Sequence, residues 1–225
     1  DEASHGDGGS SGNQGLFDSL TALQWVADNA TELGGDPERV MVFGESAGGM
    51  TTCAFLASPL AEGMFSTALI QSVGCGFLEW PLDDTEGTSY DFSAEDFGAY
   101  VASELDCSGS ESVSCMRELD AADILDATSA FDFSPTVDGV FLPTPAREAF
   151  ARGEFNRVPI IAGFNENEGV LFTGALGIDT DDALAEAISG VAAYQGWGEP
   201  TLLLETYSSD TFGSPQQAYD AFYGD

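Results

Sequence analysis

The sequence contains no lysine and a single histidine, His5. Its cationic side chains are five arginines, set against 39 aspartates and glutamates, so the formal net charge is −34 and the sequence pI is about 4.1. A chain of this sign repels nucleic acids and anionic membrane surfaces, and we expect neither as a partner. With one histidine and no Cys-x-x-Cys pair, we expect no zinc site, no other metal and no organic cofactor.

The acidity has two interpretations, and composition leaves both open. It can be a solvated acidic surface that keeps the protein soluble. It can also be an adaptation to high salt, in which counter-ions screen the repulsion between carboxylates that would otherwise destabilise the compact state.

Long apolar runs are also missing. None approaches the roughly 20 residues that a membrane-spanning helix needs, so no membrane span is expected. The 225 residues, 43% of them hydrophobic, suffice for one α/β domain with a sizeable core. The chain opens in a polar stretch and stops within an expected helix, which favours an internal piece of a longer protein.

Four cysteines are present, and an even count favours disulfides and an exported protein, secreted or periplasmic. Cys107 and Cys115 bracket a polar loop that is short enough to close. Such a bridge would stabilise the fold by about 2–3 kcal/mol in the chain-entropy model. Cys53 and Cys75 can form a second bridge, or they can be buried thiols.

The most informative stretch of the chain is residues 39–49, RVMVFGESAGG. Residues 40–43 are apolar and predict a strand buried on both faces of a parallel sheet. Gly44-Glu45-Ser46-Ala47-Gly48 follows at once, and residues 49–57 are compatible with a helix. A Gly-x-Ser-x-Gly sequence between a strand and a helix is typical of a nucleophile elbow.

This context predicts a chemical role for the turn. Ser46 is expected in a strained conformation, with its hydroxyl exposed at the carboxyl end of the strand. Gly44 and Gly48 lack Cβ atoms, so that neighbouring elements can approach closely. The N–H group of Ala47 opens the following helix, where it would stabilise negative charge on a substrate carbonyl oxygen.

The rest of the chain alternates helices and strands. Apolar residues recur on one face of a helix that begins near residue 15 or 18, and further strands are predicted at 65–71 and 158–164. Helices are expected at 94–105, 117–127, 145–152 and 180–194, with two shorter ones before residue 225. The alternation predicts an α/β fold with a mostly parallel central sheet and helices on both faces. The block 76–134 has no strand signal and is interpreted as a helical insertion.

Several motifs resemble the type-B carboxylesterase family, which includes the cholinesterases and fungal lipases. They are GNQGLFD at 12–18, ALQWV at 22–26, GGDP at 34–37, FGESAGG at 43–49, PTVDG at 135–139, VPIIAG at 158–163 and NEG at 167–169. The resemblance implies an α/β-hydrolase fold, here one incomplete domain: an elbow segment (1–75), the insertion (76–134) and a segment carrying the acid (135–225).

The resemblance also assigns residues. It implies Ser46 as the nucleophile, the Ala47 N–H as an oxyanion donor and Glu168 as the acid that orients the catalytic histidine. Glu45 would lie beside the nucleophile and make the pocket more negative. The family often closes a small disulfide loop where Cys107 and Cys115 fall. The residues alone leave two rivals to Glu168, namely Glu166 and Asp138.

Two parts of the family's site are not found in the sequence. No histidine follows Glu168, as the order Ser, Glu, His requires, and His5 is interpreted as a surface residue. The family's His-Gly-Gly-Gly-type loop, which supplies further oxyanion donors, precedes the region where this chain begins. We therefore expect a serine esterase fragment for a small-molecule ester that is inactive alone. The alternative is a non-catalytic, cholinesterase-like binding or adhesion domain.

Overall fold

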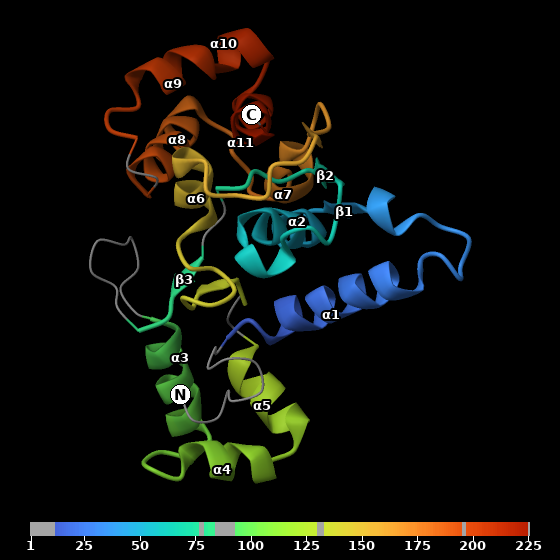
Figure 1. Cartoon of the computed structure of the whole chain (residues 1–225). Helices are drawn as coiled ribbons and strands as arrows, with labels where there is room; N and C mark the ends of the chain where they lie inside the picture. Colours follow the sequence, from blue (N-terminus) through green and yellow to red (C-terminus); the bar gives the residue numbers. More distant parts are fainter. Residues whose placement is uncertain (1–11, 77–78, 84–92, 130–132, 195–196, 225) are drawn as a thin grey trace. The chain divides into compact units, whose positions relative to one another are not determined.

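A computed structural model describes residues 12–76, 79–83, 93–129, 133–194 and 197–224 (Figure 1). The chain divides into two compact units, Asp1–Ala162 and Gly163–Asp225. Each unit has its own apolar core. The division falls inside the segment 135–225, and the expectation of one domain stays a prediction.

The first unit holds the strands and most of the predicted motifs. Its elements are α1 (Gln14–Asn29), β1 (Met41–Glu45), α2 (Ala47–Ala57), β2 (Thr67–Gln71), β3 (Trp80–Pro81), α3 (Ala94–Glu104), α4 (Ser112–Glu118), α5 (Ala121–Thr128), β4 (Thr136–Val137), α6 (Ala146–Arg152) and β5 (Ile160–Gly163), with short 3-10 turns at Pro37–Arg39 and Pro59–Ala61. The last residue of β5 opens the second unit.

The second unit is helical. Its elements are α7 (Gly169–Thr173), α8 (Asp181–Tyr194), α9 (Thr201–Thr206), α10 (Ser209–Phe212) and α11 (Pro215–Gly224). Apolar side chains of α8 and α11 form its core, among them Leu184, Ile188 and Phe222.

A three-stranded sheet of order β1-β2-β5 organises the first unit. Strands β1 and β2 are parallel, in a register that runs from Met41 opposite Thr67 to Glu45 opposite Gln71. The predicted parallel sheet is therefore confirmed. A second, two-stranded parallel sheet pairs β3 with β4. The prediction that residues 76–134 contain no strand is wrong, because a two-residue strand is too short to leave a periodic pattern.

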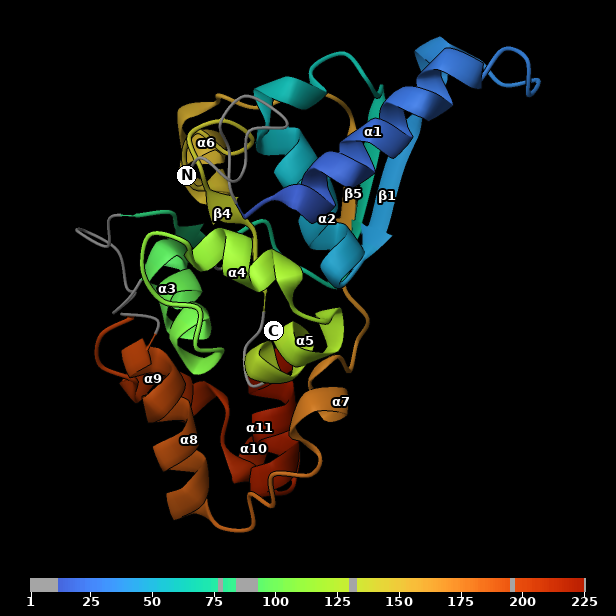
Figure 2. The same ribbon diagram turned by 90° about the horizontal axis from the view of Figure 1, so that it is seen from below.

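Helix α2 is the centre of the first core. Seven of its residues, Gly49 and Thr52 to Ala57, are buried, and Cys53, Ala54 and Leu56 are fully inaccessible to solvent. It contacts strands β1 and β2 and helices α1 and α6 (Figure 2). A helix that is apolar all round belongs inside a core, so α2 is fixed from several sides. Helix α1 contributes Leu16 and Leu23 from its predicted apolar face.

Two of the predicted strands are less buried than expected. Met41 and Phe43 of β1 are 50% and 67% exposed, and Ile161 of β5 is 69% exposed. Both strands lie at the edges of the sheet. In the described part of the first unit, side chains of the core cover Val42 and its neighbours on one face only. Burial of both strands on both faces is therefore not observed.

The helix predicted at 117–127 is in fact two helices. The chain is extended at Leu119, where α4 ends, and Asp120 precedes the first residue of α5. Asp120 is the N-cap residue of α5, and aspartate is one of the residues favoured at an N-cap. It was the sequence signal that a new helix begins here. In the second unit, α7 was not predicted, and three helices rather than two follow α8. Elements of four to six residues carry too little periodicity to be detected.

Candidate active site

Ser46 occupies a strained turn between β1 and α2. Its φ is 53° and its ψ −117°, a region that residues other than glycine rarely adopt. The turn is held on both sides, since the Ser46 N–H donates to the Gln71 carbonyl at 2.9 Å and the Ser46 carbonyl accepts from the Met50 N–H at 3.0 Å. The residue is exposed at the carboxyl end of β1. The predicted strain and exposure at Ser46 are confirmed.

Glycine is required at two positions around the turn, and one of them was missed. A Cβ at Gly44 would overlap the backbone of Gly48, as predicted. A Cβ at Gly48 would meet nothing within 4 Å, so the prediction of a close approach there is wrong. The close approach lies at Gly49, where a Cβ would collide with the Val73 side chain. The signal was a second glycine inside a helix, where glycine is normally unfavourable.

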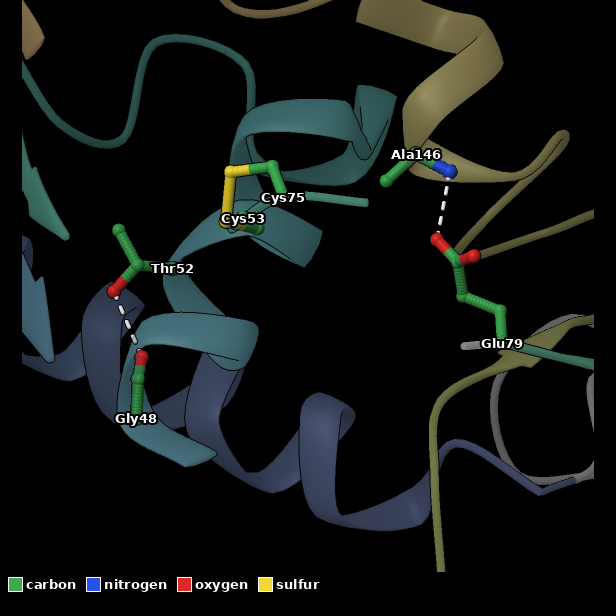
Figure 3. Close-up of a disulfide and its surroundings, with 6 residues drawn as sticks. All are labelled: Gly48, Thr52, Cys53, Cys75, Glu79 and Ala146. Carbon is green, nitrogen blue, oxygen red and sulfur yellow. Dashed lines mark hydrogen bonds between the residues drawn. A yellow bond between two sulfur atoms is a disulfide. The ribbon is translucent and has the colours of Figure 1, made fainter. Parts of the chain in front are cut away.

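The N–H of Ala47 opens α2 beside Ser46. The first N–H groups of a helix have no partner within it and carry partial positive charge, which suits them to bind an oxyanion. In the following turn, the buried Thr52 hydroxyl satisfies its hydrogen-bonding capacity locally, because it donates to the Gly48 carbonyl at 2.9 Å (Figure 3). Glu45 is exposed and lies opposite Gln71 in the sheet.

A pocket of about 330 Å³ lies beside the elbow, within the first unit. Its walls include Ala47 and the apolar side chains of Leu16, Met50 and Phe133. Asn13, 2% exposed, fixes this wall, because its side-chain amide exchanges two hydrogen bonds of 2.7 and 2.8 Å with the backbone of Thr136. The pocket offers an apolar surface beside the first turns of α2.

Both pairs of cysteines are bridged. Cys107 and Cys115 form the predicted disulfide, with Cα atoms 5.5 Å apart. Cys53 of α2 is bridged to Cys75 with Cα atoms 5.3 Å apart, so of the two alternatives for this pair the structure has the disulfide (Figure 3).

Glu168 lies at the start of α7, shortly after β5. Its Oε1 accepts hydrogen bonds from the Asn165 backbone N–H at 2.8 Å and from the Asn165 side-chain amide at 3.0 Å. Helix α7 is held against α11, because the Thr173 hydroxyl donates to the Asp220 carboxylate and a Cβ at Gly169 would overlap the Asp220 carbonyl. The carboxylate of Glu168 is thus oriented on a fixed helix.

The two rivals of Glu168 differ from it. Asp138 is 8% exposed, and one of its oxygens accepts from three successive backbone N–H groups, those of residues 140–142, at 2.8–3.0 Å. It therefore shapes its own turn. Glu166 is exposed.

The predicted residues fall in both units. Ser46, Ala47 and the pocket belong to the first unit, and Glu168 belongs to the second. His5 lies outside the described residues. Among the residues that the structure describes, no cluster of three or more histidine, cysteine or carboxylate side chains has a metal-binding arrangement. No helix in the described part of the chain is long and apolar enough to cross a membrane.

Comparison with known proteins gives the family. A family model described as "Carboxylesterase family" matches residues 3–192. The chain belongs to the carboxylesterase family. Its fold class is therefore that of the α/β hydrolases, in agreement with the parallel sheet and surrounding helices.

Curated relatives carry the same family relationship. The chain is 34% identical over 183 residues to fumonisin B1 esterase of Sphingopyxis macrogoltabida. The aligned region covers 76% of this chain and 31% of that protein. The chain is 37% identical over 169 residues to human cocaine esterase, with 73% and 29% covered. It is 33% identical over 224 residues to lipase 2 of Diutina rugosa, with 91% and 40% covered. The chain thus spans well under half the length of these relatives.

Proposed function

We propose that the chain is the nucleophile-bearing part of a serine carboxylesterase that hydrolyses a small-molecule ester through an acyl-enzyme. The observation that carries the proposal is the strained, exposed Ser46 between a parallel strand and a buried helix, in a chain of the carboxylesterase family. The proposal needs neither a metal nor an organic cofactor.

In the first half-reaction, the Ser46 Oγ attacks the ester carbonyl carbon while a histidine accepts its proton. The Ala47 N–H and further donors hold the oxyanion of the tetrahedral intermediate. The intermediate collapses, and the alcohol leaves with the proton of the imidazolium. In the second half-reaction, water attacks the acyl-enzyme, releases the carboxylic acid and restores Ser46.

The histidine base is assigned to a part of the protein beyond these 225 residues. No histidine follows Glu168 in the sequence, and the relatives are more than twice as long as the matched region. Glu168 accepts the second ring N–H of that histidine and stabilises the imidazolium. The 225-residue chain alone should then hydrolyse esters very slowly, because it lacks the catalytic histidine and loss of a triad member costs several orders of magnitude in rate.

Substitutions in the longest natural polypeptide that carries this chain test the mechanism, with a chromogenic short-chain ester as substrate. Ser46→Ala is expected to lower kcat/KM by at least about 10⁴-fold, and Glu168→Gln by about 10³- to 10⁴-fold. Ser110→Ala and Glu166→Gln are matched controls on exposed side chains and should leave kcat/KM within about twofold.

The outcomes separate the candidates. Full activity of Ser46→Ala would refute the nucleophile, and equal losses for Glu166→Gln and Glu168→Gln would remove the assignment of the acid. If the natural polypeptide itself hydrolyses no ester, the non-catalytic binding or adhesion domain replaces the enzyme. We also propose a secreted or periplasmic location, supported by the two disulfides.

A further inference from the structure

The Cys53–Cys75 disulfide joins the nucleophile helix to the segment that leaves strand β2. Cys53 is seven residues after Ser46 and is fully buried in α2, and Cys75 is four residues after the last residue of β2. Figure 3 shows the bridge on α2 at the residue after Thr52, a little more than one turn along the helix from Gly48. The bond therefore ties α2, the helix that follows the elbow, to the segment that leaves the neighbouring strand β2.

The segment from Gln71 to Cys75 follows one face of α2. Gly49 and Cys53 are four residues apart and lie on the same side of the helix. At Gly49 the segment is so close that a Cβ would collide with Val73 and lie 3.2 Å from the Gln71 carbonyl oxygen. At Cys53 it is bonded covalently through Cys75. The segment 71–75 thus packs on α2 at two places. One is Gly49, close to the elbow, and the other is the disulfide at Cys53, one turn further along the helix.

The near end of this segment holds the strained serine. The Gln71 carbonyl accepts the Ser46 N–H at 2.9 Å, and the next residue, Ser72, has a φ of 57°. A non-glycine residue persists at a positive φ only where its surroundings impose that conformation. The Gln71 carbonyl therefore holds one side of the Ser46 turn, and Gly49, three residues further on, packs against the same segment, which Cys75 anchors.

We propose that Cys53 and Cys75 are positioning residues for the Ser46 nucleophile: their bond keeps the Gln71 carbonyl on the Ser46 N–H and so holds the serine hydroxyl in its reactive orientation. The proposal rests on the proposed role of Ser46 as nucleophile. Removal of the bond lets the segment 71–75 move away from α2, since a bridged pair is limited to Cα separations of about 4–7 Å. A displacement of about 1 Å at a reacting atom can lower a rate by about 100-fold.

The chain offers a matched control. The Cys107–Cys115 bridge joins the segment after α3 to helix α4 and is the second disulfide of the chain, with a sequence separation of 8 residues against 22 for Cys53–Cys75. Its removal also costs unfolding free energy but touches neither Gln71 nor α2. A general loss of stability therefore affects both variants, whereas a loss of position affects Cys53→Ala/Cys75→Ala alone.

The first measurement is amide hydrogen exchange on the longest natural polypeptide that carries this chain, a measurement that needs no catalysis. In Cys53→Ala/Cys75→Ala, the Ser46 amide should exchange at least tenfold faster. The Ser66 amide, bonded to the Val40 carbonyl at the opposite end of the β1–β2 ladder, should change less than twofold. Cys107→Ala/Cys115→Ala should leave the ratio of the two exchange rates unchanged, because a general loss of stability acts on both amides. Equal acceleration at Ser46 and Ser66 would overturn the proposal.

A second variant retains both cysteines. Gly49→Ala pushes Val73 and the segment away from α2, and we expect the same selective acceleration at Ser46. An unchanged Ser46 amide in folded Gly49→Ala protein contradicts the proposal. If Cys53→Ala/Cys75→Ala does not fold, Cys75→Ser decides the question, because it breaks the bond and leaves Cys53 as a thiol in the core.

The second measurement is steady-state kinetics of the longest natural polypeptide, at a temperature at which each variant is folded by near-UV circular dichroism. Cys53→Ala/Cys75→Ala should lower kcat by about 10- to 100-fold with KM within about twofold, and the control pair should change neither. An unchanged kcat would overturn the positioning role. If Ser46→Ala retains full hydrolysis, the proposed function fails instead, and the exchange rates still report on the bridge.

Discussion

Glu79 is a buried carboxylate in a chain whose other acids are mostly solvated. It is 9% exposed, and its Oε1 accepts the N–H of Ala146, the first residue of α6, at 2.7 Å (Figure 3). Burial raises the pKa of this carboxyl group, and the nearby Glu148 adds to the effect, while the hydrogen bond from Ala146 opposes it. Glu79 therefore ties the segment after Cys75 to α6 from a position where a charge is unfavourable.

The raised pKa predicts a pH dependence of stability. A group with a higher pKa in the folded state contributes stability below its unfolded pKa, and this contribution is lost as the pH rises through the folded pKa. Glu79→Gln keeps an acceptor for the Ala146 N–H and removes the titration. The free energy of unfolding of wild type minus that of the variant should fall as the pH rises from about 4 to about 7.

Urea denaturation at several pH values measures this difference. Glu62→Gln, an exposed control, should show no such trend. A wild-type advantage that grows with pH would mean that the hydrogen bond to Ala146 outweighs the burial of the charge.

At the scale of elements, the junction of β1 and α2 depends on where glycine is placed. Gly44 faces the backbone of Gly48 without space for a Cβ, whereas Gly48 itself faces open space. Substitution of Gly44 should therefore cost more unfolding free energy than substitution of Gly48, although both belong to the same motif.

We predict that Gly44→Ala destabilises the chain by about 1–3 kcal/mol or more, because a methyl group in a filled space forces the backbone to shift. Gly48→Ala should be neutral or stabilise by up to about 1 kcal/mol, because alanine is the better helix former and no atom lies in the way. Free energies of unfolding from urea titrations test both. Equal effects of the two substitutions would contradict the contact at Gly44.

The sequence predicted the elements that carry a long or sharp local signal. The apolar spacing of α1, the strand-turn-helix around Ser46 and the short loop between Cys107 and Cys115 depend on neighbouring residues, and all three are observed. The exposure of Phe43 was not predictable, because it depends on which strand lies at the edge of the sheet. The choice between a bridge and buried thiols at Cys53 depends on the approach of the segment after β2, which only the tertiary structure fixes.

At the scale of the whole molecule, the main feature is the excess of negative over positive charge. Only five arginines accompany 39 acidic residues, and two ion pairs among the described residues, Arg39–Asp36 and Arg152–Glu148, are solvent-exposed. Exposed ion pairs contribute little, typically about 0–1 kcal/mol each. The remaining carboxylates repel one another across the surface, and this repulsion is open to screening by salt.

We predict that NaCl stabilises the chain at neutral pH. Between 0.1 and 1 M salt the Debye length falls from about 10 to about 3 Å, so the repulsion between carboxylates is largely removed. If this contributes about 1–2 kcal/mol, the Tm rises by about 2–8 °C for a chain of this size. Near the pI of about 4.1 the net charge vanishes, and the salt effect should shrink with it. A Tm independent of NaCl at pH 7 would exclude the high-salt interpretation of the composition.

The exposed face of β1 also gives the molecule a built-in chemical reporter. Met41 is 50% exposed there, whereas Met50 and Met64 are less accessible and serve as internal references. Mild peroxide converts accessible methionine thioethers to sulfoxides, a change that peptide mass spectrometry detects. Any polypeptide that packs on this face of β1 would bury Met41 and protect it from peroxide. The fraction of Met41 sulfoxide therefore reports, for each preparation, whether this face of the sheet is covered.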